Sequence, residues 1–136
     1  MILRSIILTI LFSFTAVLSF AQIKTAQDLI SVFESSSSSL DQVLETFSLK
    51  YHTTTSNVKI YKGSYQDLYV TLNENQISEV LLRNHLGYKL KSVEKSLSGD
   101  CKLMNKDKKR RIYTNTKYQF AFVINDSKNE VALTLK

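Results

Sequence analysis

The feature that most constrains this 136-residue chain is an alternation of apolar and polar side chains with a period of two residues. It appears in two blocks, one within residues 58–82 and one within residues 112–135, and each block follows a segment with helical spacing. A period of two indicates strands that bury one face. Turns containing glycine or asparagine separate the runs and favour hairpins. Each block therefore predicts a three-stranded antiparallel meander.

Three helices are expected, two before the first block and one between the two blocks. Thr25 and Asp28 form a predicted capping box ahead of an apolar face, and Ser39 and Gln42 form a second one. The serine run 35–39 is interpreted as a connector between those two helices, because serine side chains compete for backbone hydrogen bonds. A third apolar stripe, at Leu86, Leu90, Val93 and Leu97, predicts a helix that ends at Gly99.

The two blocks correspond to each other. Ile60 and Tyr61 recur 52 residues later as Ile112 and Tyr113, and Leu68 recurs at the same offset as Phe120. The predicted fold is α+β: a duplicated helix–three-strand unit with halves at about 39–83 and 86–136, preceded by a signal peptide and one extra short helix. One antiparallel sheet is expected, with the helices packed on its apolar face. The residues assigned to that face include Leu68, Val70, Phe120 and Phe122.

This order of elements resembles that of the β-lactamase inhibitory proteins, small exported bacterial proteins with tandem repeats of a helix and antiparallel strands. The resemblance covers residues 39–136 as an order of elements and matches no diagnostic residue set. Similarity in element order alone does not transfer function, and the lone Cys101 cannot form the disulfides of that family. The end of the first segment, Ser19-Phe20-Ala21-Gln22, is similar to signal peptides of exported Bacteroidetes proteins.

The N-terminus has the three regions of a signal peptide. Arg4 supplies a positive charge, an apolar run extends from Ile6 to Phe20, and small residues stand at Ser19 and Ala21. Cleavage after Ala21 would leave residues 22–136 as a single α+β domain, exported to the periplasm or secreted. The competing interpretation is a retained membrane anchor, for which the apolar run is short. After cleavage, no transmembrane segment is expected.

The distribution of charge indicates one candidate binding region. Residues 83–111 contain ten basic and three acidic residues. The densest basic group is expected between strands at the sheet edge, and consists of Lys106, Lys108, Lys109, Arg110 and Arg111. It fits either a solvated loop or a patch that meets an acidic protein, an anionic glycan or membrane headgroups. Nucleic acid is disfavoured as a partner by export and by the absence of an RNA-reading motif.

The sheet face opposite the helices is the second candidate. Tyrosine is enriched at interfaces, whereas tyrosine, threonine and valine are also common on exposed strands by propensity alone. The residues assigned to this face are Tyr61, Tyr69, Thr71, Tyr113, Ala121, Val123, Ala132 and Thr134.

Motifs for catalysis are not found, and neither a cofactor nor a metal site is expected. The histidines His52 and His85 belong to no ligand-spaced group. The leading hypothesis is an exported soluble binding protein that acts through protein–protein contact, as an inhibitor, an immunity-type protein or an envelope accessory protein. The alternative is a small envelope hydrolase that uses Cys101 with a histidine base, or scattered carboxylates. The carboxylates considered are Glu74, Glu79, Asp126 and Glu130.

Overall fold

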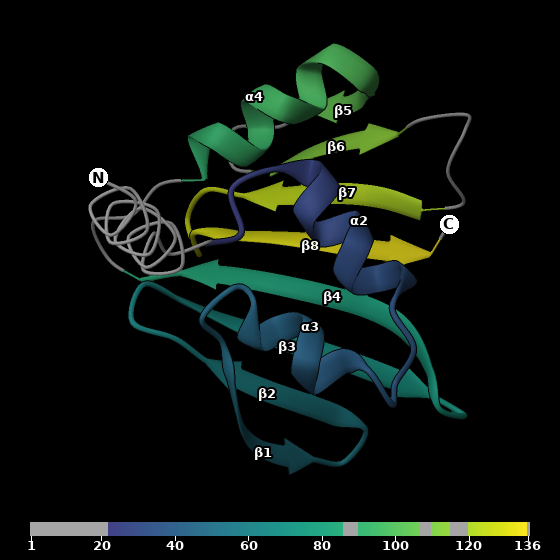
Figure 1. Ribbon diagram of the computed structural model, residues 1–136. Helices are drawn as coiled ribbons and strands as arrows, with labels where there is room; N and C mark the ends of the chain where they lie inside the picture. The colour runs from purple at the N-terminus through teal and green to yellow at the C-terminus, as the bar shows by residue number, and fades with distance from the viewer. Residues whose placement is uncertain (1–21, 86–89, 107–109, 115–119, 136) are drawn as a thin grey trace, which may run out of the picture.

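The computed structural model describes residues 22–85, 90–106, 110–114 and 120–135. These residues form three helices and one antiparallel sheet of eight strands in the order β1-β2-β3-β4-β8-β7-β6-β5 (Figure 1). The predicted α+β class is confirmed. In chain order the elements are α2 (Ala26–Glu34), α3 (Leu40–Glu45), β1 (Lys50–Thr55), β2 (Val58–Lys62), β3 (Gln66–Asn73), β4 (Gln76–Asn84), α4 (Lys91–Asp100), β5 (Lys102–Lys106), β6 (Arg110–Thr114), β7 (Phe120–Asn125) and β8 (Glu130–Leu135).

The helix ends agree only in part with the sequence. Thr25 caps α2 as predicted: its hydroxyl accepts from the Asp28 amide, and the Asp28 carboxylate accepts from the Thr25 amide, both at 3.1 Å. The second predicted capping box is wrong, because the hydroxyl of Ser39 bonds to Ser36 and makes no capping bond to α3. The predicted stop at Gly99 is also wrong, since α4 runs through to Asp100. Leu86 lies outside the described residues.

The sheet consists of two four-stranded meanders, β1–β4 and β5–β8, joined at the centre by the antiparallel pairing of β4 with β8. Each repeat unit therefore has four strands, where the sequence predicted three. The extra strands, β1 and β5, are the two edge strands. All six residues of β1 are exposed, so this strand lacks the alternation by which the others were predicted.

The register shows which residues of the two halves correspond. Leu68 pairs with Tyr61, and the equivalent partner of Tyr113 is Phe122. Phe122, rather than Phe120, is therefore the structural counterpart of Leu68. The predicted offset was two residues short here because the β6–β7 connection is longer than the β2–β3 connection.

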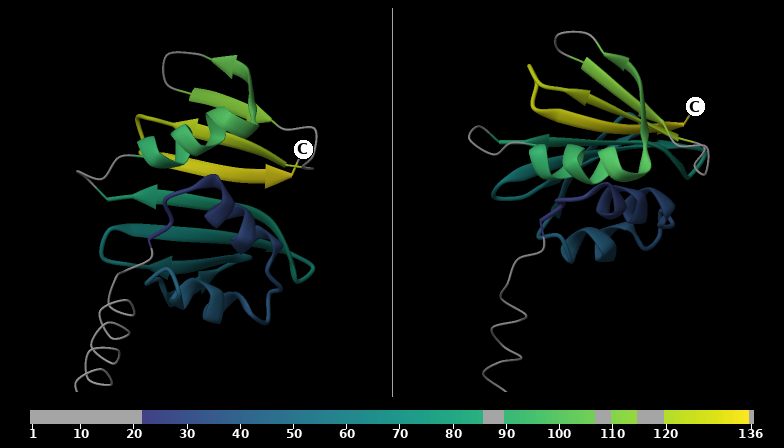
Figure 2. Two further views of the ribbon diagram at one scale, coloured as in Figure 1. Left: turned by 45° about the horizontal axis from the view of Figure 1, so that its top comes forward. Right: turned by 90° about the horizontal axis from the view of Figure 1, so that it is seen from above.

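All three helices lie on one face of the sheet (Figures 1 and 2). The extra helix α2 lies over β4 and β8, where the two halves meet. The face carrying Leu68, Val70, Phe120 and Phe122 is buried as predicted. The ring of Phe33 on α2 contacts that of Phe120, with a centroid distance of 5.4 Å. In the described part of the chain, no helix is long and apolar enough to cross a membrane.

Tyr61 and Tyr113 correct the predicted face assignment. Both were placed on the face opposite the helices, but both are buried in the core. The hydroxyl of Tyr61 donates to Asp41 on α3, and that of Tyr113 donates to Glu94 on α4 at 2.9 Å. Burial and these hydrogen bonds raise the pKa of both tyrosines. Each half thus uses a buried tyrosine to attach its own helix, and the preceding isoleucine points to the other face.

Candidate binding face

The face of the sheet that no helix covers, called the outer face below, carries a continuous apolar row. Cross-strand pairing aligns one residue from each of the six inner strands across this face. Each of these residues is partly exposed. The apolar row consists, in spatial order, of Ile60, Tyr69, Leu81, Ala132, Val123 and Ile112.

A charged row borders it on one side. Its members are Lys62, Asp67, Arg83, Glu130, Asn125 and Arg110. At its centre, Arg83 donates from Nε to Glu130 at 2.8 Å, which raises the pKa of the guanidinium. The Arg83 guanidinium also lies 5.1 Å from the ring centre of Tyr69. Arg83 is therefore held between a carboxylate and an aromatic ring, and this fixes the Tyr69 side chain on the outer face.

The other side of the apolar row is almost free of charge. It consists of Val58, Thr71, Glu79, Thr134, Ala121 and Thr114, in register across the same six strands. Only Glu79 carries a charge in this neutral row. The apolar row thus has chemically different flanks, although the two halves of the sheet are built alike.

The structure brings together only some of the residues named from sequence. Tyr69, Thr71, Ala121 and Val123 lie on the outer face, with Ala132 and Thr134 beside them. Ile60, Leu81, Ile112 and Arg83 were missed. The alternation of apolar and polar residues would have predicted this face correctly if Tyr61 and Tyr113 had been assigned to the buried face of the sheet.

The basic segment 106–111 is divided by the fold. Lys106 ends β5 and Arg110 begins β6, and these two strands are paired at one edge of the sheet. Lys108 and Lys109 lie outside the described residues. Arg110 is exposed in the charged row, whereas Arg111 faces the helix side and is largely buried. The expectation of a single basic patch including Arg111 is therefore wrong.

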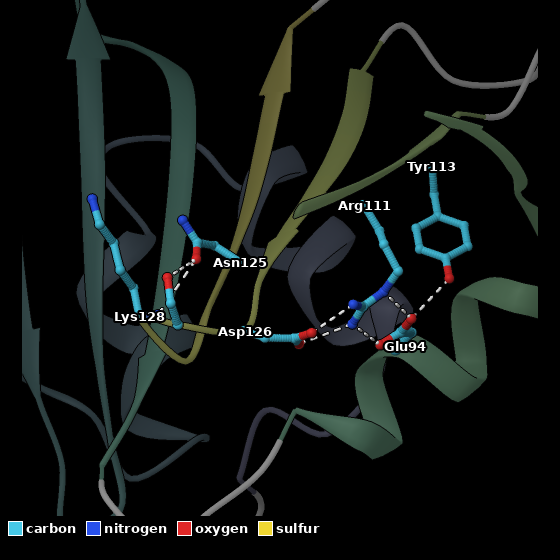
Figure 3. Close-up of polar contacts among 7 residues, drawn as sticks. Glu94, Arg111, Tyr113, Asn125, Asp126 and Lys128 are labelled. Atoms are coloured by element: carbon cyan, nitrogen blue, oxygen red, sulfur yellow. Dashed lines mark hydrogen bonds and ion pairs between the residues drawn. The ribbon is translucent and has the colours of Figure 1, made fainter. Parts of the chain in front are cut away.

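Arg111 instead joins α4 to the sheet (Figure 3). Its guanidinium donates to both oxygens of Glu94 at 2.6 Å, and to Asp126 at 2.6 and 2.9 Å. These hydrogen bonds lower the pKa of both carboxyls, and they raise the pKa of Arg111. Tyr113 adds a further hydrogen bond to Glu94. The cluster stays ionised near neutral pH and serves as a structural connection.

The same contacts weigh against the hydrolase hypothesis. Hydrogen bonds from Arg111 lower the pKa of Asp126, whereas a general acid needs a raised pKa, and Glu130 is paired with Arg83. Cys101 lines a groove of about 180 Å³, whose described lining residues include neither a histidine nor a carboxylate. His85 bonds to Asp67 at 3.1 Å, and His52 is exposed on β1. Over the described ranges, no group of histidine, cysteine or acidic residues could hold a metal ion.

No family model, curated protein or solved structure matches this chain. The similarity in element order to the β-lactamase inhibitory proteins stays a prediction.

Proposed function

We propose that the protein is exported, loses residues 1–21 and binds a protein partner on the outer face of its sheet. The observation that carries this proposal is the apolar row across six strands. An antiparallel sheet with one solvated face normally places polar side chains there. A continuous apolar strip with polar borders is typical of an interaction surface.

The edges of the sheet support the face as the site of contact. Both edge strands have a register irregularity at equivalent places, between Tyr51 and Thr53 in β1 and between Leu103 and Asn105 in β5. Each edge strand also begins with a lysine. Bulges and lysines are devices that oppose the addition of another strand. Docking on the face is therefore favoured over pairing at an edge.

Tyr69 is the anchor of the proposed surface. It lies in the apolar row, and Arg83 restrains its ring. Tyrosine and arginine are enriched among the residues that dominate binding energy, and a preordered ring loses little conformational freedom on binding. The exposed cations Lys62 and Arg110 lie near opposite ends of the charged row, so the proposal favours a partner with acidic groups there.

Leu81→Lys is expected to reduce capture of the partner from an envelope extract at least about tenfold, because it puts a charge at the centre of the apolar row. Gln42→Lys adds the same charge on the exposed side of α3, across the sheet, and should capture as the parent does. Circular dichroism establishes that both variants fold. Equal capture of the same proteins by Leu81→Lys and the parent would show that the outer face is not the docking site.

Processing tests the export part of the proposal. The protein purified from its native host is expected to begin at Gln22, because Ser19 and Ala21 are the small residues that signal peptidase recognises. Intact-mass measurement and N-terminal sequencing decide this. A mass that retains residues 6–20 would contradict cleavage and would indicate a membrane-tethered protein.

A further inference from the structure

Two lysines lie directly opposite each other at one end of the sheet. Lys50 of β1 pairs with Lys62 of β2, and both side chains are exposed. Like charges at directly opposed positions destabilise a sheet. Within the described ranges, neither lysine forms an ion pair with a carboxylate. On its other side Lys62 lies opposite Asp67 of β3, which offsets part of this repulsion, whereas Lys50 stands on an edge strand with no strand on its far side.

The other half of the protein shows that this pair is not required by the fold. Tyr51 pairs with Tyr61 as Leu103 pairs with Tyr113, so the counterpart of the Lys50–Lys62 pair is Lys102–Thr114. The same backbone pairing thus accepts a neutral threonine in place of the second lysine. The pairing of the edge strand therefore does not require a lysine at position 62.

Both lysines line a groove of about 740 Å³ between the α3–β1 connection and the β2–β3 turn. Gly63 allows these two segments to approach, because a Cβ atom there would lie 3.0 Å from both the Ser48 carbonyl oxygen and the Leu49 Cδ2 atom. Ser48 and Ser64 also line the groove, and their hydroxyls have no hydrogen-bond partner among the described residues. Glu45 supplies the single carboxylate of the lining.

We propose that this groove binds an oxyanion, a sulfate or phosphate group. The ammonium groups of Lys50 and Lys62 supply the charge, and the hydroxyls of Ser48 and Ser64 are further donors. Binding would relieve the repulsion between the two lysines, and charge-assisted hydrogen bonds to an oxyanion are the strong kind. Lys62 also ends the charged row of the outer face, but binding of the anion is tested without a protein partner, so the two proposals can fail independently.

The experiment is an NMR titration of the purified, ¹⁵N-labelled protein with inorganic sulfate and with inorganic phosphate, at constant ionic strength set by chloride. Saturable shifts are expected at the amides of Ser48, Gly63 and Ser64. Lys62→Thr, which copies the pair in the other half and so should fold, is expected to weaken binding about tenfold. Lys102→Thr is the matched control and should leave the affinity unchanged. The site is refuted if neither anion gives saturable shifts, or if the two variants weaken binding equally.

Two further arms identify the source of the anion. Tighter binding of a sulfated disaccharide than of inorganic sulfate, lost in Lys62→Thr, supports a glycan. Lys62-dependent binding to vesicles of phosphatidylglycerol, but not to vesicles of phosphatidylcholine, supports a lipid headgroup. Lys62-dependent binding of the inorganic ions alone supports a free anion.

Discussion

Phe122→Ala is expected to lower the free energy of unfolding by about 3–5 kcal/mol. The side chain is 1% exposed, and its ring meets that of Phe120 edge to face at a centroid distance of 5.7 Å. Truncation would leave a cavity between the sheet and the helices, and close packing prevents full collapse around it. Domains of this size have total stabilities of about 5–15 kcal/mol, so much of the stability would be lost. Urea unfolding followed by circular dichroism measures the change.

Phe122→Leu is the matched control. Leu68 occupies the corresponding position in the other half, so a leucine already packs in this environment elsewhere in the sheet. The expected cost is smaller than that of Phe122→Ala, at about 1.5 kcal/mol, because most of the volume is kept. Equal losses for the two variants would contradict the assigned correspondence between the halves.

Arg111→Met is expected to destabilise the protein by about 2–3 kcal/mol at neutral pH. This loss is smaller than the loss from breaking a fully buried ion pair, because Glu94 and Asp126 are partly exposed. Removing the guanidinium leaves two carboxylates facing each other and separates α4 from β6. Arg111→Lys should recover only part of the loss, since an ammonium group cannot make the four hydrogen bonds of the planar guanidinium. Thermal and urea unfolding compare the three proteins.

The pH dependence of that difference follows from the carboxyl pKa values. The pKa values of Glu94 and Asp126 are lowered in the folded protein, so unfolding raises the pKa of both carboxyls to its ordinary value. Their contribution is therefore present at neutral pH and is lost as the pH falls below about 4. The stability gap between parent and Arg111→Met should narrow between pH 6 and pH 3. A gap that stayed constant over this range would show that the ion pairs contribute little.

Most of the fold could be predicted because its signals are local. Apolar alternation marks six strands, and the Thr25–Asp28 box marks the start of α2. The edge strand β1 was not predicted because all six of its residues, Lys-Tyr-His-Thr-Thr-Thr, are exposed, so its sequence shows no alternation of apolar and polar side chains. Ser39 failed as a cap because a serine run offers partners within itself.

The candidate surface was harder to predict, since it depends on which neighbour in a dipeptide faces the core. In Ile60-Tyr61 and Ile112-Tyr113 the tyrosines face inward, because carboxylates on the facing helices accept their hydroxyl hydrogens. Asp41 and Glu94 lie about 20 residues away in sequence, so periodicity alone cannot identify them as partners. The same reason applies to Arg111, whose partners lie on α4 and in the β7–β8 turn.

The pairing of β4 with β8 is centred on Leu81 and Ala132, since Val80 pairs with Leu133 and Leu82 with Val131. Two separate chains joined in this way would form an isologous dimer, and dilution would dissociate it. Here one covalent chain holds both halves at a high effective concentration, so the sheet persists at any protein concentration. Covalent linkage also lets the halves differ, as the charged and neutral rows do. A partner docking on this sheet would therefore meet it in one orientation and with a stoichiometry of one to one.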